Sequence, residues 1–365
     1  MTRSSTVPLE PEVIHSTKLR WGILSTARIG RRNWRAMRDS GVASLVAVAS
    51  RDLEKAGQFI HEMQGEAPWP ECPLASNYEE LLANPAVDAV YIPLPTGLRK
   101  EWVIRAARAG KHVLCEKPCA VSAEDLQEMI DACRQHRVHF MDGVMFMHDP
   151  RLSALREILD EGVQVGALRR ISSAFSFLGD AEFMGSNIRG QVALEPTGCL
   201  GDLGWYCLRA ALWVMRWEMP QRVSGRTLSS VLDRDGNEAI TDFAADLDFA
   251  GGVSGNFHCS FLAPEQQWLN ISGTAGSIRV ADFVSPAVEN DTDWELDYQR
   301  VPRCAGGWMS HEARMFARFA AEIADASLAC NWGEISWKTQ VLLDACHESA
   351  RSGRPLFLRD GVYLA

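Results

Sequence analysis

The amino-acid sequence predicts an α/β domain built on a parallel sheet, followed by an α+β domain with a large open, mostly antiparallel sheet. From Leu19 to about Gly143, short apolar runs rich in β-forming residues alternate with amphipathic helical stretches, as in a parallel sheet wrapped by helices. After Pro150, strand-like runs follow one another with hairpin turns between them. The length of 365 residues suits two domains, each with an apolar interior of its own.

In the first half, each expected strand is a nearly continuous apolar run, as a strand covered on both faces should be. The expected strands are residues 21–25, 45–50, 89–93, 112–115 and 138–141. The spacing of N-terminal helix-capping pairs occurs at Asn77 with Glu80 and at Ser122 with Asp125. Gly41 and Gly110 stand where helix C-caps are expected. Helices are therefore expected between the strands.

The second half begins with an expected helix over residues 151–161 and then becomes rich in strands. The expected strands are residues 168–177, 243–249, 253–261 and 268–280. Gly251-Gly252 and Thr274-Ala275-Gly276 have the composition of hairpin turns. Helices over residues 310–325 and 336–351 are expected near the end of the chain. Because an open sheet usually has one face without helices, a homodimer or tetramer through that face is expected.

Composition narrows the function classes. The net charge of −10 and the lack of a basic run argue against nucleic-acid binding, and no stretch approaches the roughly 18 uncharged apolar residues of a membrane span. The ten cysteines form no CxxC pair, and Cys115 with Cys119 has no second pair beside it, so no metal site is expected. Scattered reduced thiols and the lack of an export signal in residues 1–17 indicate a cytoplasmic protein with a small-molecule partner.

The first expected strand runs into Ser25-Thr26-Ala27-Arg28-Ile29-Gly30, which aligns with a GxGxxG turn if Ser25 and Ala27 replace the first two glycines. Small side chains still let the backbone approach a pyrophosphate, which the next helix N-terminus would attract. An ordinary strand-to-helix turn is the alternative. The sequence therefore indicates a dinucleotide site here, in a domain of the Rossmann type.

The end of the second expected strand indicates which dinucleotide is bound. Sites that prefer NAD place an acidic residue about twenty positions beyond the last glycine, and here Ser50 and Arg51 occupy that place. The Arg51 guanidinium can bind a 2′-phosphate through two hydrogen bonds and can stack on adenine. NADP is therefore the expected cofactor, with NAD possible. A solvated surface charge is the other reading of Arg51.

At the end of the fourth expected strand, Glu116-Lys117-Pro118 places a lysine at the carboxyl edge of the sheet, where open α/β sheets bind ligands. Together with DAVYIPLP at 88–95, AGKHVLCEKP at 109–118 and GDLGWYC at 201–207, this segment closely resembles the Gfo/Idh/MocA oxidoreductases. The resemblance runs from Lys18 to about Pro355. It is nearest to the branch with glucose-fructose oxidoreductase, dimeric dihydrodiol dehydrogenase and xylose dehydrogenase, whose aspartate and tyrosine match Asp202 and Tyr206.

The resemblance implies a Rossmann domain and an α+β domain with substrate held between them. It implies that Lys117 contacts the reacting hydroxyl, that Tyr206 exchanges the proton, and that Asp202 orients the substrate or the tyrosine. Lys117, Arg189, Asp202 and Tyr206 are the expected substrate contacts. The expected cofactor contacts are Ser25, Thr26, Ala27, Arg28, Ile29, Gly30, Ser50, Arg51, Pro93, Pro95, Thr96, Glu116 and Lys117. The corresponding domains are 18–146 and 147–365, after a flexible tail at 1–17.

Physical chemistry supports these roles but leaves other readings open. Asp202 and Tyr206 share a helix face at i and i+4, and an ammonium near a phenol favours the phenolate, so Tyr206 is expected to titrate nearer to the working pH. Alternatively, Lys117 pairs only with Glu116 or Asp202, Tyr206 is a core aromatic, and Asp202 is a helix N-cap.

The sequence also departs from the family pattern. Thr96 and Arg99 stand where relatives often have Asn and His, and Arg189 could equally form a surface salt bridge. His148 and His311 are not placed among the catalytic residues, since a lone histidine is more often structural.

The expected activity is hydride transfer between a nicotinamide and a carbinol or carbonyl carbon of a sugar, sugar derivative or cyclic diol. One alternative is an NADP-binding regulatory or sensor protein without turnover. Another is an enzyme whose tightly held nucleotide cycles between oxidising one sugar and reducing another. The sequence does not choose the substrate or the direction.

Overall fold

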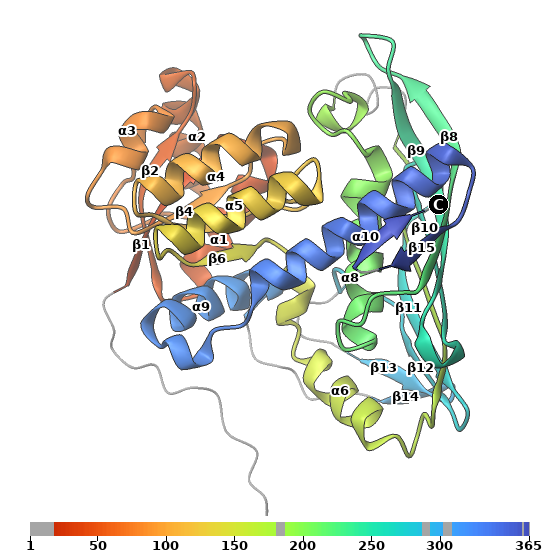
Figure 1. The fold of residues 1–365 in the computed structure, drawn as a ribbon. Helices are drawn as coiled ribbons and strands as arrows, with labels where there is room; N and C mark the ends of the chain where they lie inside the picture. Colours follow the sequence, from red (N-terminus) through yellow and green to blue (C-terminus); the bar gives the residue numbers. More distant parts are fainter. Residues whose placement is uncertain (1–17, 180–186, 287–292, 302–308, 360, 365) are drawn as a thin grey trace, which may run out of the picture.

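The computed structural model describes residues 18–179, 187–286, 293–301, 309–359 and 361–364. Two sheets organise these residues: a six-stranded sheet from the first half of the chain and a ten-stranded sheet from the second half (Figure 1). The predicted fold class, a parallel α/β domain plus an α+β domain with a large, mostly antiparallel sheet, is confirmed.

The six-stranded sheet has the order β3-β2-β1-β4-β5-β6, and all of its neighbouring strands are parallel. Its strands are β1 Leu19–Leu24, β2 Ala43–Ala49, β3 Leu74–Ser76, β4 Ala89–Ile92, β5 His112–Cys115 and β6 Phe140–Asp142. The helices between them are α1 Arg28–Asp39, α2 Leu53–Glu66, α3 Tyr78–Ala83, α4 Thr96–Arg108 and α5 Ala123–Gln135. The strand order reverses between β1 and β4, where open α/β sheets bind ligands.

The local signals in this half agree with the structure. Asn77 and Glu80 form the predicted capping box at α3, and the Ser122 side chain accepts a hydrogen bond from the Asp125 N–H at α5. The five predicted strands are confirmed, with ends shifted by one or two residues. The short edge strand β3 was not predicted, because two of its three residues are exposed and it contains no apolar run.

The ten-stranded sheet has the order β14-β13-β12-β11-β7-β10-β9-β8-β15-β16. β7 and β10 are parallel, and the other paired strands are antiparallel. Its strands are β7 Leu168–Ser176, β8 Arg222–Leu232, β9 Glu238–Asp248, β10 Ser254–Ser260, β11 Gln266–Gly273, β12 Ser277–Val280, β13 Trp294–Leu296, β14 Gln299–Val301, β15 Leu356–Arg359 and β16 Val362–Leu364. The helical elements of this half are η1 Met145–His148, α6 Arg151–Glu161, η2 Ile188–Gly190, η3 Leu200–Gly204, α8 Trp205–Val214, η4 Ala250–Gly252, α9 His311–Ala324, η5 Ala326–Leu328 and α10 Trp332–Ser352.

Two predictions about this sheet need correction. The run at 268–280 is two strands, β11 and β12, joined at the predicted turn around Thr274-Ala275-Gly276. The long strand β8 was not predicted, because its outer half is largely exposed and its apolar residues Leu228, Val231 and Leu232 do not alternate with polar ones.

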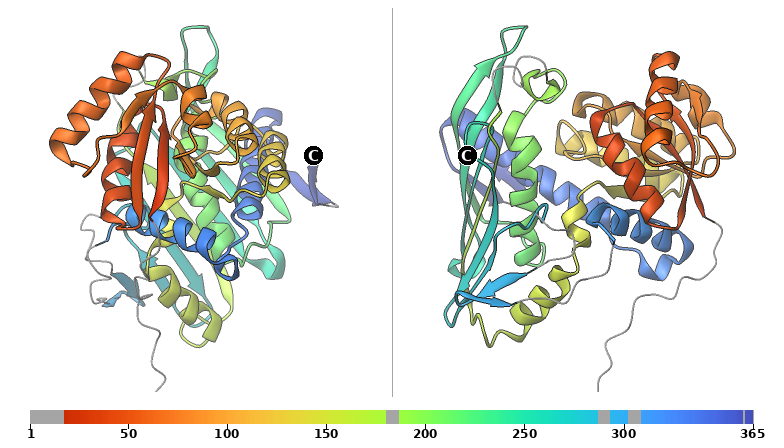
Figure 2. Two further views of the ribbon diagram at one scale, coloured as in Figure 1. Left: turned by 90° about the vertical axis from the view of Figure 1, so that its left-hand side faces the viewer. Right: turned by 180° about the vertical axis from the view of Figure 1, so that it is seen from behind.

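One face of the ten-stranded sheet is covered by helices and the other is not (Figures 1 and 2). On the covered face, α10 lies so close to β8 that a Cβ at Gly225 would stand 2.1 Å from the Cys346 carbonyl oxygen. Over the described residues, the views show no helix on the opposite face. The side chains of the uncovered face are therefore available to solvent or to another molecule.

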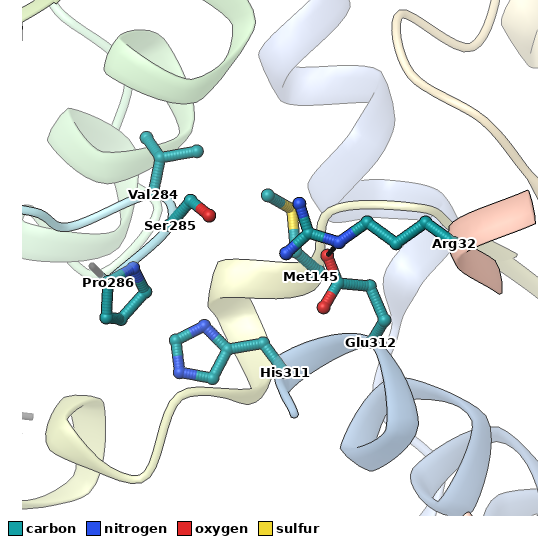
Figure 3. Close-up of a pocket in the computed structure, with 7 residues that line it drawn as sticks. All are labelled: Arg32, Met145, Val284, Ser285, Pro286, His311 and Glu312. Atoms are coloured by element: carbon teal, nitrogen blue, oxygen red, sulfur yellow. Dashed lines mark ion pairs between the residues drawn. The ribbon is translucent and has the colours of Figure 1, made fainter. Parts of the chain in front are cut away.

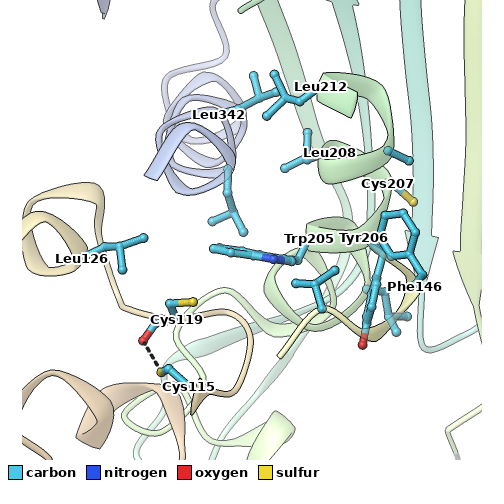
Figure 4. Packing of buried hydrophobic residues seen from close by; sticks show 14 of the residues in the cluster. Cys115, Cys119, Leu126, Phe146, Trp205, Tyr206, Cys207, Leu208, Leu212 and Leu342 are labelled. Atoms are coloured by element: carbon cyan, nitrogen blue, oxygen red, sulfur yellow. Dashed lines mark hydrogen bonds between the residues drawn. The ribbon is translucent and has the colours of Figure 1, made fainter. Parts of the chain in front are cut away.

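The helix α8 forms the centre of the core between the sheets. All ten of its residues are buried, and Figure 4 shows Leu212 beside Leu342 of α10, while Trp205 extends toward the side of Cys119 and Leu126. The preceding turn, η3, is a π-helix, which rotates the following residues relative to a regular α-helix.

The C-terminal half also contributes to the first domain's core. In α9, Phe316 and Phe319 pack on Trp21 of β1, with ring centroids 5.1 and 4.9 Å apart. The boundary at 146/147 therefore stays a prediction about sequence segments, since the chain returns to the parallel sheet after the second sheet is complete.

Candidate active site

The turn between β1 and α1 has the features of a pyrophosphate site. Ser25 has a φ of 148°, in a region that favours glycine, and its Oγ accepts a hydrogen bond from the Ala27 N–H at 3.0 Å. Ala27 is the N-cap of α1, which has no side-chain cap and no acidic residue in its first turn. Arg28 and Ile29 are exposed, and Gly30 is buried against Phe59. The positive end of the α1 dipole is thus available to an anion.

The end of β2 carries the two residues expected to distinguish NADP from NAD. Ser50 is buried, and its Oγ accepts a hydrogen bond from the Asp52 N–H at 3.2 Å. Arg51 is exposed, and over the described part of the chain its guanidinium has no ion-pair partner. The donors present, α1 and the free guanidinium of Arg51, fit a dinucleotide with an additional phosphate.

Lys117 is held by the second half of the chain. Its Nζ donates to the Asp202 carboxylate at 2.8 Å and to the Asp202 carbonyl oxygen at 2.7 Å. The Arg189 Nε donates to the other carboxylate oxygen of Asp202 at 2.6 Å. Burial alone would raise the pKa of Asp202, but the cations Arg189 and Lys117 and their hydrogen bonds hold it well below its ordinary value. The structure therefore joins three of the predicted substrate residues in one ionic cluster.

Tyr206 completes this cluster, but not in the predicted ionisation state. The Lys117 Nζ lies 4.6 Å from the centre of the Tyr206 ring, so the ammonium faces the ring rather than the hydroxyl. The hydroxyl donates to the Met145 Sδ at 3.6 Å. Burial, followed by the negative charges of Glu116 and Asp202, raises the pKa of Tyr206 well above its ordinary value. The prediction of a lowered pKa is wrong, and the phenol is protonated at neutral pH.

Asp202 is not a helix cap. It lies inside the π-helical turn η3. The N-cap position of η3 is Cys199 and that of α8 is Gly204, and neither position has a side-chain capping hydrogen bond. Its carboxylate is committed to Lys117 and Arg189 instead. The capping reading of Asp202 is therefore wrong, and the ion pair with Asp202 that was given as an alternative reading of Lys117 is present.

Glu116 belongs to a buried hydrogen-bond chain beside the cluster. Its Oε1 accepts from the Tyr91 hydroxyl at 2.6 Å, and that hydroxyl accepts from the Asn33 amide of α1 at 2.6 Å. Its Oε2 accepts from the Lys117 backbone N–H at 3.2 Å. Glu116 therefore links the α1 helix to the segment that carries Lys117.

The start of α4 meets a residue that sequence reasoning missed. Pro95 is the N-cap of α4 and makes no side-chain cap, while Pro93 is buried. The Thr96 hydroxyl donates to the Glu195 carboxylate at 2.5 Å, and its backbone N–H donates to the same carboxylate at 3.2 Å. Thr96 is 3% exposed, so its hydroxyl is occupied within the protein. Nothing in the local sequence marks Glu195, because its partners lie about a hundred positions away.

A small pocket of about 10 Å³ is lined by Met145, whose sulfur accepts from the Tyr206 hydroxyl, and is drawn in Figure 3. Met145 joins the pocket to the tyrosine hydroxyl. An ion pair between Arg32 Nε and Glu312 Oε1, 2.7 Å apart, lies at its edge. The lining residues are Arg32, Met145, Val284, Ser285, Pro286, His311 and Glu312. Burial lowers the pKa of His311, which points into this space from α9. Polar groups thus surround the space next to the phenol.

Two findings bear on other classes of site. Over the described residues, no cluster of three or more His, Cys, Asp or Glu side chains is placed to hold a metal ion. No described helix is long and apolar enough to cross a membrane.

A parallel sheet with an anion-binding turn, and a lysine at its carboxyl edge held by a second domain, define a dinucleotide-dependent oxidoreductase. Residues 19–144 match the family model for the oxidoreductase family with an NAD-binding Rossmann fold, and residues 152–279 match the GFO/IDH/MocA C-terminal domain. The chain belongs to the Gfo/Idh/MocA oxidoreductase family, which confirms the resemblance seen in the sequence.

Relatives of known activity support the enzyme class. The chain is 30% identical to D-xylose 1-dehydrogenase (NADP(+)) 2 of Haloferax volcanii, over 91% of this chain and 98% of that protein. It is 33% identical to dTDP-3,4-didehydro-2,6-dideoxy-α-D-glucose 3-reductase of Actinomadura kijaniata, over 92% and 97% of the two chains. A 3-ketoreductase of A. kijaniata, solved with NADP and TDP-benzene, has a TM-score of 0.79 at 25% identity and is covered to 98%, with 91% of this chain. These relatives confirm the prediction of an NADP-dependent dehydrogenase or reductase.

Proposed function

We propose that this enzyme transfers a hydride between NADP and a carbinol or carbonyl carbon of a sugar, sugar derivative or cyclic diol, with Lys117 and Tyr206 handling the substrate oxygen and its proton. The observation that carries the proposal is the Lys117 ammonium, held on the Asp202 carboxylate and directly over the Tyr206 ring. Relatives acting on xylose, on dihydrobenzenediols and on dTDP-linked keto sugars support this substrate class.

Lys117 has one N–H left for a substrate. An ammonium has three donors, and two are used by the carboxylate and the carbonyl oxygen of Asp202. The remaining donor can bind the reacting oxygen and stabilise negative charge on it. Asp202 fixes the direction of that donor, because both of its carboxylate oxygens are held by cations. Lys117 therefore acts by orienting and polarising the carbonyl.

Tyr206 is suited to donate a proton. Because its pKa lies well above the ordinary value, the phenol keeps its proton at neutral pH and can give it to the carbonyl oxygen during reduction. In the opposite direction the Tyr206 phenolate, formed by loss of that proton, would receive the carbinol proton. A bound nicotinamide supplies or accepts the hydride. The ionisation state of Tyr206 at neutral pH is thus the one that proton donation during reduction requires.

The cofactor would be held by the Ser25–Gly30 turn and by Arg51. The first turn of α1 offers backbone N–H groups to a pyrophosphate, and Arg51 offers its guanidinium to a 2′-phosphate. Pro93, Pro95 and Glu116 lie at the same edge of the sheet as Lys117, where the nicotinamide end would lie.

The test is a panel of aldoses, keto sugars and trans-dihydrodiols, assayed with NADP⁺ or NADPH. We expect Lys117→Ala and Tyr206→Phe to lower kcat on the best substrate by about 100-fold or more, as positioned proton-transfer groups do. Lys55→Ala and Tyr298→Phe are matched controls, since both side chains are exposed. Turnover within a few-fold of wild type in the first pair of variants would disprove the assigned roles.

The cofactor is tested by tryptophan fluorescence titration with NADPH and NADH. Wild type is expected to prefer NADPH by about tenfold or more, and Arg51→Ala is expected to lose that preference, equivalent to about 1.4 kcal/mol. Tight NADPH binding without turnover on any substrate, together with a specific protein partner, would instead support a regulatory or sensor protein.

A further inference from the structure

The segment at residues 187–199, called here the bridging segment, connects the two sheets across the active site. At one end Arg189 binds Asp202. In the middle, the Val192 N–H donates to Asp233 of the β8–β9 turn at 3.0 Å. At the other end, Gly198 has a φ of 51° and lies so close to β9 that a Cβ would stand 2.2 Å from the Ile240 carbonyl oxygen. The segment is thus fixed to the second domain at both ends.

The first domain contacts the bridging segment at the start of α4. The Gly97 N–H donates to the Leu194 carbonyl oxygen at 3.0 Å, and a Cβ on Gly97 would stand 2.5 Å from the Ala193 carbonyl oxygen. Next to this contact, the Glu195 carboxylate accepts from the Thr96 N–H and hydroxyl. The thirteen-residue helix α4 has no side-chain cap and no acid in its first turn. Glu195 therefore supplies, from the other domain, the negative charge that a helix N-terminus favours.

The direction of the hydrogen bonds shows that Thr96 is the donor to Glu195. Arg99 can only donate, and its Nη1 lies 3.0 Å from the Thr96 Oγ1, so the threonine oxygen accepts from it. The threonine hydrogen is then directed to the Glu195 Oε2, 2.5 Å away. Arg99 also donates to the Pro118 carbonyl oxygen, next to Lys117. Hydrogen bonds thus connect the Lys117 loop to the bridging segment through Arg99, Thr96 and Glu195.

We propose that Glu195 is a positioning residue that, through Thr96 and Arg99, docks the bridging segment on α4 and so holds Arg189 on Asp202 for substrate binding. Thr96 and Arg99 are the partners that this docking requires. The link to substrate binding rests on the proposed function. The docking itself does not, because it is argued from hydrogen bonds within the chain alone.

The activity test uses two changes on opposite sides of the contact. Glu195→Ala removes the carboxylate, and Gly97→Ala places a methyl group against the Ala193 carbonyl oxygen without touching any polar group of the site. We expect both variants to raise the KM of the best sugar or diol about tenfold or more, while kcat and the Kd of NADPH stay within about threefold. Thr96→Val removes the hydroxyl that donates to Glu195, so it should raise the KM in the same direction. Glu238→Ala, at an exposed position of β9, is the matched control.

A second measurement is independent of turnover. Trypsin cleaves after arginine, and Arg189 lies in the bridging segment, so the rate of cleavage between Arg189 and Gly190 reports its docking. We expect Glu195→Ala and Gly97→Ala to raise that rate about tenfold or more at a temperature where circular dichroism shows both variants folded. If Glu195→Ala does not fold, Gly97→Ala and Thr96→Val provide the test.

The outcomes separate the two proposals. If the enzyme turns over no substrate but trypsin cleaves the variants faster, the proposed function is wrong and the proposed docking is supported. Unchanged cleavage in both variants would overturn the docking, even if the wild type is active. A Kd for NADPH that rises as much as KM would also overturn it, because Thr96 and Glu195 would then serve the cofactor.

Discussion

At the residue scale, the centre of the site is one carboxylate shared by two cations. Asp202 is bound by Lys117 and Arg189, and its side chain is 12% exposed. Removing one member of such a buried group leaves the others without compensation, which costs more than the group contributes as a whole. Asp202 is therefore needed both for the position of Lys117 and for the stability of the region around it.

Asp202→Asn is expected to lower the free energy of unfolding by about 3 kcal/mol at pH 7, because two cations remain beside a neutral amide. The pKa of Asp202 is lowered in the folded state, so its contribution is present above the unfolded pKa of about 3.9 and is lost as the pH falls through the lower folded value. Urea unfolding at pH 7 and at about pH 3 should therefore show a smaller difference between variant and wild type in acid. An equal difference at both pH values would contradict this role.

Tyr206 should affect the pH dependence of kcat, whereas Asp202 affects the pH dependence of stability. Its raised pKa means that the phenol stays protonated below about pH 10, the ordinary value, and loses its proton only above it. The Tyr206-dependent part of kcat for reduction should therefore be flat from about pH 6 to 9 and fall only in stronger alkali. Comparison of the wild-type profile with that of Tyr206→Phe isolates this part. A Tyr206-dependent limb centred near neutrality would show that the hydroxyl is not buried in the working enzyme.

The predicted site residues that the structure brings together are those carried by local motifs. Lys117 follows a strand end, and Asp202 and Tyr206 lie within one short segment, so their juxtaposition with Lys117 followed from the resemblance. The ionisation state of Tyr206 did not follow from the resemblance, because it depends on burial and on whether the Lys117 ammonium faces the ring or the hydroxyl. Glu195 was missed because a carboxylate that caps a distant helix leaves no pattern in its own neighbourhood.

At the element scale, the turn between β1 and α1 combines an anion site with a strained residue. Ser25 occupies the first glycine position of the motif and has a φ of 148°. A non-glycine residue in this region costs on the order of 1–3 kcal/mol. Its Oγ offsets part of this cost by accepting from the Ala27 N–H. The turn therefore keeps a glycine-like backbone although the glycine is absent.

Replacing Ser25 distinguishes strain from hydrogen bonding. Ser25→Gly should raise the free energy of unfolding by about 1 kcal/mol, since relief of strain exceeds the added freedom of the unfolded chain. Ser25→Ala keeps the strained backbone and removes the hydroxyl, so it should lower stability by about 1 kcal/mol. Urea unfolding of the two variants and wild type measures the order of their free energies of unfolding. A glycine variant no more stable than the alanine variant would show that the backbone carries no strain.

The pattern of apolar residues in the sequence predicted some strands well and missed others. The strands of the parallel sheet were predicted to within a few residues because both faces are covered and their sequences are apolar throughout. In the ten-stranded sheet, β8 was missed because much of it is exposed, and the π-helical turn η3 has no sequence signature. Turn chemistry was more reliable there, since the glycines at 251 and 252 both adopt positive φ angles.

At the scale of the whole molecule, the domains are joined by buried polar contacts. Arg209 of α8 donates to Asp142 of β6 at 2.5 Å and to Thr339 of α10 at 2.8 Å, and the Arg209 and Asp142 side chains are fully buried. With α9 packed on β1, these contacts tie the parallel sheet to the helices that cover the second sheet. The site thus lies between two domains that share a continuous interior.

The uncovered face of the ten-stranded sheet is the surface through which we propose that the protein forms dimers. The register places Arg226, Ala244, His258, Ala174 and Trp268 side by side across five strands on this face. Directly paired residues of neighbouring strands share a face. Ala244 and Ala174 carry the smallest side chains of this row, and the His258 ring pairs with the Asp242 carboxylate at 2.6 Å beside it. An open sheet face whose polar groups are paired in this way suits a second copy of itself related by a two-fold axis.

Ala244→Arg tests this surface, because a two-fold axis near its centre would bring the two new cations close together inside the interface. We expect the wild type to sediment as a dimer or tetramer and the variant to dissociate at micromolar concentration, since like charges buried in an interface cost several kcal/mol. Ala75→Arg, an exposed alanine on β3, adds the same charge elsewhere and should not change the assembly. A wild type that is monomeric in analytical ultracentrifugation, or an Ala244→Arg variant that keeps the wild-type mass, would place any contact between copies on another surface.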